Sequence, residues 1–175
     1  MKVTYYVASS IDGYIAKENG DVSWLDDLGI SMEETGYDHF FSSVDGLVMG
    51  RNTYNFVFDY GTWPYEDKPA WVCTSTELNV MEGCQLQKAI KPSDVVKEAG
   101  ELGLKHLWLV GGGKLAGSFI QEKMLTHLSI SQMPIILGSG IKLVDGLTES
   151  IRLKSGKVQQ YQSGFSQLEF EIEYV

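Results

Sequence analysis

Residues 107–119 read LWLVGGGKLAGSF and place three consecutive glycines between an apolar segment and an apparent helix: Gly111, Gly112 and Gly113. A strand that runs through glycines into a helix leaves unpaired backbone N–H groups at the helix start, where the helix dipole adds partial positive charge. Such a turn can bind a phosphate group, and Lys114, which precedes Leu115 in the first helical turn, would add a positive charge. The alternative is a tight corner whose glycines serve only the backbone conformation.

Two phosphate-binding motifs can be compared with this turn. Residues 111–116 formally satisfy G-x-G-x-x-G/A, the fingerprint of dinucleotide binding, but the acidic residue expected about 20 positions later is missing. Ser118 and Phe119 stand where a Walker loop requires lysine followed by serine or threonine. The prediction of a phosphate site therefore rests on the strand–glycine–helix arrangement and on neither motif.

Two further junctions have similar chemistry. VMGRNTY (48–54) leads from a short strand into an expected helix and supplies a backbone turn, a guanidinium and a hydroxyl: Gly50, Arg51, Asn52 and Thr53. WVCTST (71–76) leaves Thr74, Ser75 and Thr76 at the end of another strand. Ligands of open α/β sheets bind outside the carboxyl ends of the strands, so three such ends suit a ligand with several phosphates. Arg51 as a surface ion pair, and the hydroxyls as helix caps, are the structural alternatives.

The surrounding pattern predicts the elements that must bring these junctions together. Strands are expected at 3–9, 46–49, 69–75, 107–110 and 125–137, helices after Ser31, Ser93 and Gly113, and a short helix or turn after Gly50. Residues 151–175 alternate in polarity and predict antiparallel strands. Strands that alternate with helices indicate an α/β fold, one domain over 1–175, with a mostly parallel sheet and antiparallel strands at one edge.

Composition limits the partners. A formal net charge of −9 argues against nucleic acid and anionic membranes, and the sequence has no run of 18 apolar residues. Two cysteines are too few for a disulfide framework, and three histidines without ligand spacing predict no metal site. We expect a cytoplasmic protein that acts on a small molecule.

VMGRNTY, WVCTS and LVGGGKL, in this order, resemble the dihydrofolate reductase-like superfamily. ASSIDGYIA and PIILGSGIKLV are similar to the branch that includes the reductase domain of the riboflavin-biosynthesis deaminase–reductase, and the resemblance spans nearly the whole chain. It implies a three-layer α/β fold, NADPH as cofactor and a homodimer. It also implies that residues 111–115 hold the pyrophosphate, while Arg51, Thr53, Thr74 and Ser75 face the adenosine 2′-phosphate.

The same resemblance assigns the substrate side. The segment from Asp12 to Trp24 would form a mobile loop beside the nicotinamide, with Trp24 equally interpretable as a core residue and Asp12 as a turn former. The riboflavin-branch reductase has a substrate-contacting acidic residue just before the glycines, where this chain has Val110. That difference leaves the substrate open.

Reduction of a C=N or C=O bond also needs a proton source near the heteroatom. Asp38, and after it Glu34, are the candidates in the expected first helix. Glu34 is alternatively the capping-box partner of Ser31, and Asp38 a solvated helix residue.

The sequence thus predicts an NADPH-dependent reductase of a small heterocycle or ribosyl-heterocycle, of the 5-amino-6-(5-phosphoribosylamino)uracil reductase type. Dihydrofolate reductase and a non-catalytic nucleotide-binding protein on the same fold are the alternatives.

Overall fold

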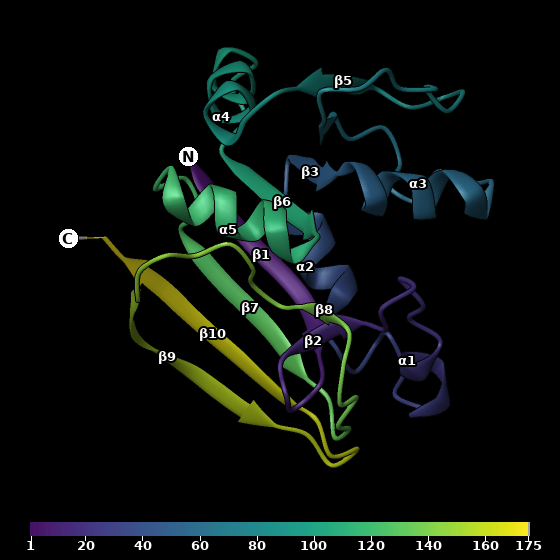
Figure 1. Cartoon of the computed structure of the whole chain (residues 1–175), viewed down its shortest axis with the longest axis vertical. Coiled ribbons are helices and arrows are strands. Elements are labelled where there is room, and N and C mark those ends of the chain that lie inside the picture. Colours follow the sequence, from purple (N-terminus) through teal and green to yellow (C-terminus); the bar gives the residue numbers. More distant parts are fainter. Residues whose placement is uncertain (175) are drawn as a thin grey trace.

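A computed structural model describes residues 1–174, apart from the side chain at position 155. An eight-stranded sheet forms its centre, in the order β5-β4-β3-β6-β1-β7-β10-β9 (Figure 1). Its strands are β1 (Lys2–Ser9), β3 (Gly46–Gly50), β4 (Ala70–Cys73), β5 (Leu86–Ala89), β6 (His106–Gly111), β7 (His127–Gln132), β9 (Arg152–Gln160) and β10 (Ser166–Glu173). The strands from β5 to β7 are parallel, and β10 and β9 continue the sheet in antiparallel pairing. This confirms the predicted fold class.

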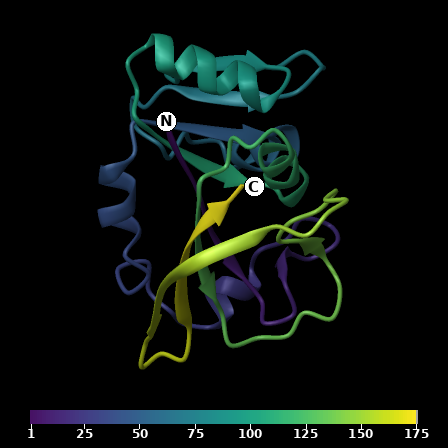
Figure 2. The same ribbon diagram turned by 90° about the vertical axis from the view of Figure 1, so that its left-hand side faces the viewer.

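A second, two-stranded sheet joins β2 (Tyr14–Ala16) to β8 (Ile141–Lys142). The helices are α1 (Trp24–Asp27), α2 (Tyr37–Ser43), α3 (Arg51–Tyr60), α4 (Pro92–Glu101) and α5 (Gly113–Gln121). Figure 2 shows helices on both faces of the main sheet, which is the expected three-layer arrangement.

Alternation along the strands creates the two cores. In β6, Leu107 and Leu109 point to the face covered by α4 and α5, while Trp108 points to the opposite face. Val48 and Met49 of β3 divide between the faces in the same way. Successive side chains of a strand point to opposite faces, so these continuous apolar runs fill both layers at once.

Two expected helix starts are corrected by the structure. Ser31 Oγ does accept a hydrogen bond from Glu34 N at 3.3 Å, but the segment makes only a turn, and α2 begins at Tyr37. Gly36, with φ +71°, separates the turn from the helix because a left-handed residue cannot continue a right-handed one. Similarly, α4 begins at Pro92 rather than after Ser93, because proline suits the first helical position.

The expected strand boundaries were too wide at two places. The strand predicted at 125–137 is β7, which ends at Gln132, two residues before Pro134, a residue without the N–H that further pairing needs. The strand predicted at 69–75 is β4, which ends at Cys73. The antiparallel strands predicted in the C-terminal segment are β9 and β10.

Candidate active site

The starts of α3 and α5 lie side by side because the strands that lead into them are neighbours. Met49 of β3 pairs with Gly111 of β6. A Cβ added to Gly50 would lie 3.7 Å from the Gly111 carbonyl oxygen, so the two turns nearly touch. Since the first N–H groups of a helix have no partner within it, two sets of donors face the same space.

The glycines of the second turn have different roles. A Cβ on Gly113 would lie 2.0 Å from the backbone oxygen of Lys142, so Gly113 allows the end of β8 to pack against α5. Gly111 has φ +155°, a conformation that side chains rarely adopt. The tight-corner interpretation therefore accounts for both residues.

Gly112 has neither constraint. Its φ is −99°, and the nearest atom to an added Cβ would be Thr53 Oγ1 at 3.9 Å, an ordinary contact. Beyond its two chain neighbours, no described residue would crowd a side chain here, and the position lines the cavity at the start of α5. A glycine there allows close approach of another molecule to the backbone.

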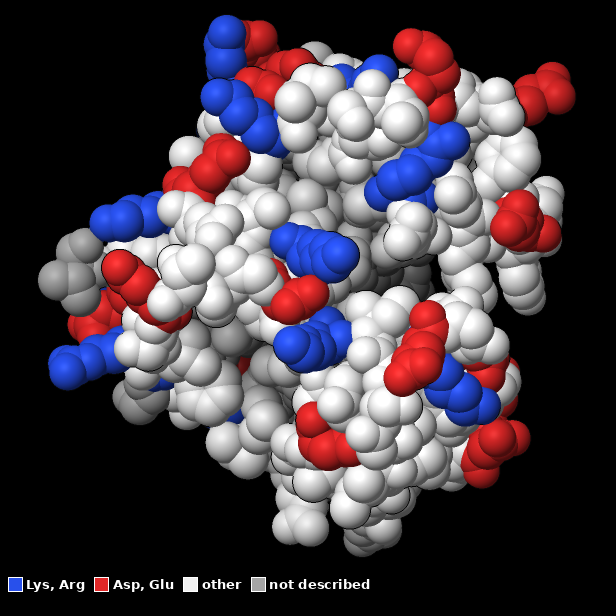
Figure 3. All heavy atoms as spheres, in the orientation of Figure 1, with Lys and Arg blue, Asp and Glu red and all other residues white. Residues whose placement is uncertain are grey.

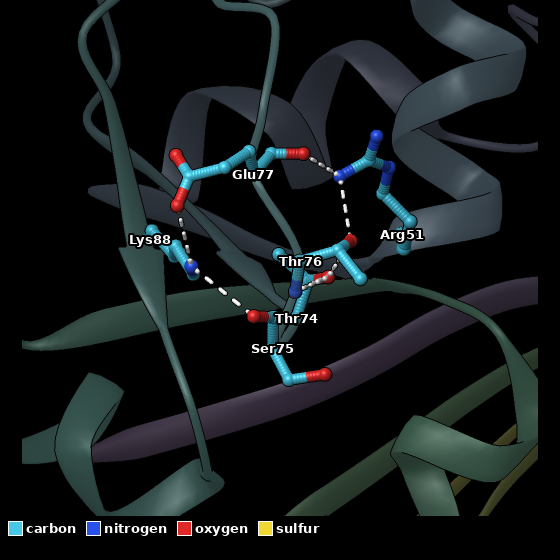
Figure 4. Close-up of polar contacts among 6 residues, drawn as sticks. All are labelled: Arg51, Thr74, Ser75, Thr76, Glu77 and Lys88. Atoms are coloured by element: carbon cyan, nitrogen blue, oxygen red, sulfur yellow. Dashed lines mark hydrogen bonds and ion pairs between the residues drawn. The ribbon is translucent and has the colours of Figure 1, made fainter.

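Arg51, at the start of α3, is held by its neighbours (Figure 4). Its Nε donates to Asn55 Oδ1 at 3.0 Å, and its Nη1 donates to Thr76 Oγ1 at 3.0 Å and to the Glu77 carbonyl oxygen. Thr76 is fixed in turn by Thr74, whose Oγ1 is 3.0 Å from Thr76 Oγ1. A guanidinium has five N–H donors, so the two on Nη2 have no partner among the described residues and can bind an anion.

Thr74 and Ser75 do not line the cavity. Thr74 acts on Arg51 through Thr76, and the Ser75 carbonyl accepts a hydrogen bond from Lys88 Nζ at 3.4 Å (Figure 4). The structure thus brings Arg51, Asn52 and Thr53 together with the glycine turn, while Thr74 and Ser75 contact residues outside the cavity lining.

A single large cavity joins these elements, with a volume of about 1720 Å³. Figure 3 shows it as a hollow across the face of the molecule, with lysine or arginine side chains beside it. Pockets for drug-sized ligands measure roughly 300–1,000 Å³, so there is room for a dinucleotide and a second small molecule. Its cations are Arg51, Lys114 and Lys142.

Another part of the cavity, which we call the aromatic end, is lined by rings. Trp108 lies at the centre of a ring cluster, with its ring centroid 5.5 Å from that of Tyr65, 5.8 Å from Tyr37 and 6.1 Å from Tyr6. The Trp108 Nε1 donates to the Tyr6 carbonyl oxygen at 3.0 Å, which fixes the indole. These four rings line the cavity, and we call them the aromatic wall.

The predicted substrate-side residues have mixed placements. Val110 lines the cavity between the aromatic wall and the glycines. Trp24 does not: it is 2% exposed and packs with Met133 and Phe165, so it is a core residue. Asp12 accepts hydrogen bonds from the backbone N–H groups of Leu137, at 3.1 Å, and Gly138, at 2.7 Å, and so connects two loops.

The two predicted proton donors lie away from this chemistry. Glu34 and Asp38 are exposed, and neither lines the cavity. Gly36 ends the turn that carries Glu34, and α2 starts after it. The apolar side of α2 packs against the sheet through Tyr37, Phe40 and Phe41. The carboxylates that do line the cavity are Glu18, Asp21, Asp26, Asp59 and Asp145.

Sequence reasoning missed the aromatic wall and Lys142. Tyr6 and Trp108 occur in apolar strands and Tyr37 in an expected helix, where each is indistinguishable from a core residue. The described residues contain no cluster of three or more His, Cys, Asp or Glu that could hold a metal ion.

The glycine turn fits NADPH, the cofactor that the sequence predicts. Gly112 leaves room for close approach, two helix starts supply N–H donors, and three cations balance the charge of a polyanion. Arg51 retains free donors beside them.

The model of the RibD C-terminal domain family matches residues 1–166. The chain belongs to this family. Curated proteins of similar sequence include the uncharacterized protein YwjB of Bacillus subtilis (strain 168), 31% identical over 91% of this chain and 92% of that protein. The uncharacterized protein YyaP of the same strain is 27% identical over 93% of this chain and 90% of YyaP.

Solved structures agree with this family. A protein of Shewanella sp. PV-4, provisionally named for riboflavin biosynthesis, has 29% identity and a TM-score of 0.85 over 99% of this chain and 100% of its own. A diaminohydroxyphosphoribosylaminopyrimidine deaminase/5-amino-6-(5-phosphoribosylamino)uracil reductase of Thermotoga maritima has a TM-score of 0.72 at 14% identity. The matched region covers 98% of this chain but only 56% of the Thermotoga protein. The second likeness concerns the fold of a RibD C-terminal domain. Among the described helices of this chain, none is long and apolar enough to cross a membrane.

Proposed function

We propose that this protein is an NADPH-dependent reductase of a small heterocyclic substrate. The observation that carries the proposal is the division of one cavity into an anion-binding end and an aromatic end. When bound, the cofactor supplies a hydride, and the substrate carbon of a C=N or C=O bond accepts it while the heteroatom takes a proton. Each turnover consumes one NADPH and one proton.

The described residues have distinct roles in this proposal. The N–H groups at the start of α5, beside Gly112, bind the pyrophosphate, with Lys114 adding charge. The free Nη2 of Arg51 binds the adenosine 2′-phosphate, which NADH lacks. The aromatic wall holds the substrate ring and excludes water from one side of it.

Proton transfer is not assigned to Glu34 or Asp38, because both side chains lie outside the cavity. Water that enters at the open side of the cavity supplies the proton in our proposal. The sequence-based prediction of these two residues stays untested.

Isothermal titration of the purified protein with NADPH and with NADH is the first test. We expect NADPH to bind at least tenfold more tightly. Similar affinities would remove the role of Arg51, and no binding of either would refute the proposed function. Tight binding without NADPH oxidation across a panel of heterocycles would identify a nucleotide-binding protein instead.

A further inference from the structure

The charges that line the cavity are unevenly distributed. Arg51 and Lys114 lie at the starts of α3 and α5, and Lys142 lies where β8 packs against Gly113, with its Nζ 3.8 Å from Asp145 Oδ1. All three cations therefore belong to the end that the proposed function gives to the cofactor.

No cation lines the aromatic end among the described residues. Asp21 and Asp26 come from the segment around α1, and Asp59 lies near the far end of α3, about 12 Å along the axis from Arg51 at 1.5 Å per residue. Lys17 offsets only Asp21, since its Nζ donates to Asp21 Oδ2 at 2.8 Å, and no cation that lines the cavity in the described part of the chain pairs with Asp26 or Asp59. Lys68 lies outside the cavity, with its Nζ above the Phe41 ring and bound to the Val44 carbonyl oxygen at 2.8 Å.

The aromatic wall offers flat faces and neutral hydroxyls. Tyr6 OH donates to the Thr35 carbonyl oxygen at 2.9 Å, whereas the hydroxyls of Tyr37 and Tyr65 have no hydrogen-bond partner among the described residues. Burial raises the pKa of both phenols, so they stay protonated at neutral pH. Phenols in this state can donate to, or accept from, ring nitrogen and carbonyl groups.

We infer that the aromatic end takes a planar, uncharged heterocycle that carries no phosphate. This inference rests on the proposed function and narrows its substrate class. A phosphate dianion at this end would meet the carboxylates of Asp26 and Asp59 with no cation among the described cavity residues to offset them, in a protein of net charge −9. An uncharged ring, in contrast, gains stacking and apolar contact with the wall at no electrostatic cost.

Riboflavin and its 5′-phosphate, FMN, form a matched pair of probes that differ only in the phosphate. Binding is measured by flavin fluorescence anisotropy with saturating NADP⁺, which occupies the cofactor end and prevents the FMN phosphate from using Arg51 or Lys114. We expect riboflavin to bind at least tenfold more tightly than FMN. Equal affinities, tighter binding of FMN, or no binding of either flavin would overturn the inference.

Two pairs of variants, each with one residue that lines the cavity and one that does not, test whether the cavity lining determines flavin binding. Met32 and Val80 are similarly exposed, at 61% and 58%, but only Met32 lines the cavity. Met32→Lys should raise the affinity for FMN relative to riboflavin about tenfold, while Val80→Lys should leave the ratio unchanged. Tyr37→Leu should weaken riboflavin binding about tenfold, and Phe58→Leu, outside the cavity, should not.

The flavin titrations are repeated without NADP⁺, so that the two proposals can fail separately. NADPH binding without a preference for riboflavin would refute the inference and leave the reductase proposal in place. A preference for riboflavin in a protein that binds no NADPH would refute the reductase proposal and leave the inference in place.

Discussion

Gly112 is the residue at which the role of the glycine turn can be decided. Its neighbour Gly113 is required by the backbone oxygen of Lys142, whereas an added Cβ at Gly112 meets only Thr53 Oγ1 at 3.9 Å. A substitution at Gly112 therefore changes the surface offered to a ligand with little effect on packing.

We expect Gly112→Ala to keep the wild-type melting temperature and to weaken NADPH binding more than tenfold, which corresponds to about 1.4 kcal/mol. Calorimetric titration and a thermal melt of the same sample measure both quantities. Gly113→Ala is the matched control: its Cβ would overlap the Lys142 carbonyl, so it should lower the melting temperature. Unchanged affinity in Gly112→Ala would favour the corner interpretation.

Arg51 determines the choice between the two nicotinamide cofactors in our proposal. Its guanidinium is already oriented by Asn55 and Thr76, and its free donors would bind the 2′-phosphate. Arg51→Gln should reduce NADPH affinity about tenfold and leave NADH affinity unchanged, as titration of each cofactor would show. An equal loss for both cofactors would indicate that Arg51 positions α3 and does not contact the phosphate.

At the scale of the elements, the site depends on the pairing of β3 with β6, and Asp45 joins the starts of these strands. Its Oδ2 accepts hydrogen bonds from the backbone N–H groups of Lys105, at 2.8 Å, and His106, at 2.9 Å. The hydrogen bond from the Lys105 N–H is the main cause of the lowered pKa of Asp45, whereas burial acts to raise this pKa. A carboxyl whose pKa is lower in the folded than in the unfolded state stabilises the fold at pH values above its unfolded-state pKa.

We expect Asp45→Asn to lower the melting temperature at pH 7 by about 2–4 °C, equivalent to ~1 kcal/mol. The difference from wild type should shrink below about pH 4, as the folded wild-type carboxyl becomes protonated and its contribution is lost. Melts at pH 7 and pH 3 test this. A difference that persists at pH 3 would mean that the ionised carboxylate is not the cause.

At the scale of the whole molecule, the main sheet has β5 at one edge and β9 at the other. The outer edge of β9 has no partner strand among the described residues, and Leu153 and Val158 are 43% and 64% exposed. Leu153 pairs with Ile172 and Val158 pairs with Leu168 on β10. Ile172 and Leu168 are four residues apart and therefore share one face, so Leu153 and Val158 also lie on the face that carries the core under α5. We propose that a second copy of the chain covers this region and forms the homodimer.

Light scattering should then give twice the 19.5 kDa mass of the chain. Val158→Lys should shift the protein toward monomer, because a charge on the exposed apolar strip opposes its burial. Ile90→Lys, 65% exposed at the distant β5 edge, serves as a comparison that should stay dimeric. A wild-type protein of 19.5 kDa in solution would refute the dimer.

The sequence by itself determined the α/β class, the antiparallel C-terminal strands and the junctions at Arg51 and Gly112. These features depend on short-range properties: strand alternation, glycine conformation, and the donors that every helix start exposes. Since parallel strands end at one edge of a sheet, recognising the strands placed both junctions at the same edge, and the pairing of β3 with β6 then made them neighbours.

Only the tertiary structure decided the remaining parts. The need for glycine at 113 comes from Lys142, 29 residues away, and the aromatic wall combines rings from four separate segments. Trp24 proved to be a core residue, and Glu34 and Asp38 proved to be outside the cavity, because long-range packing selects which side of a segment faces inward. A side chain's type is encoded locally, but its neighbours are fixed by sheet register and layer packing, which no short stretch of sequence specifies.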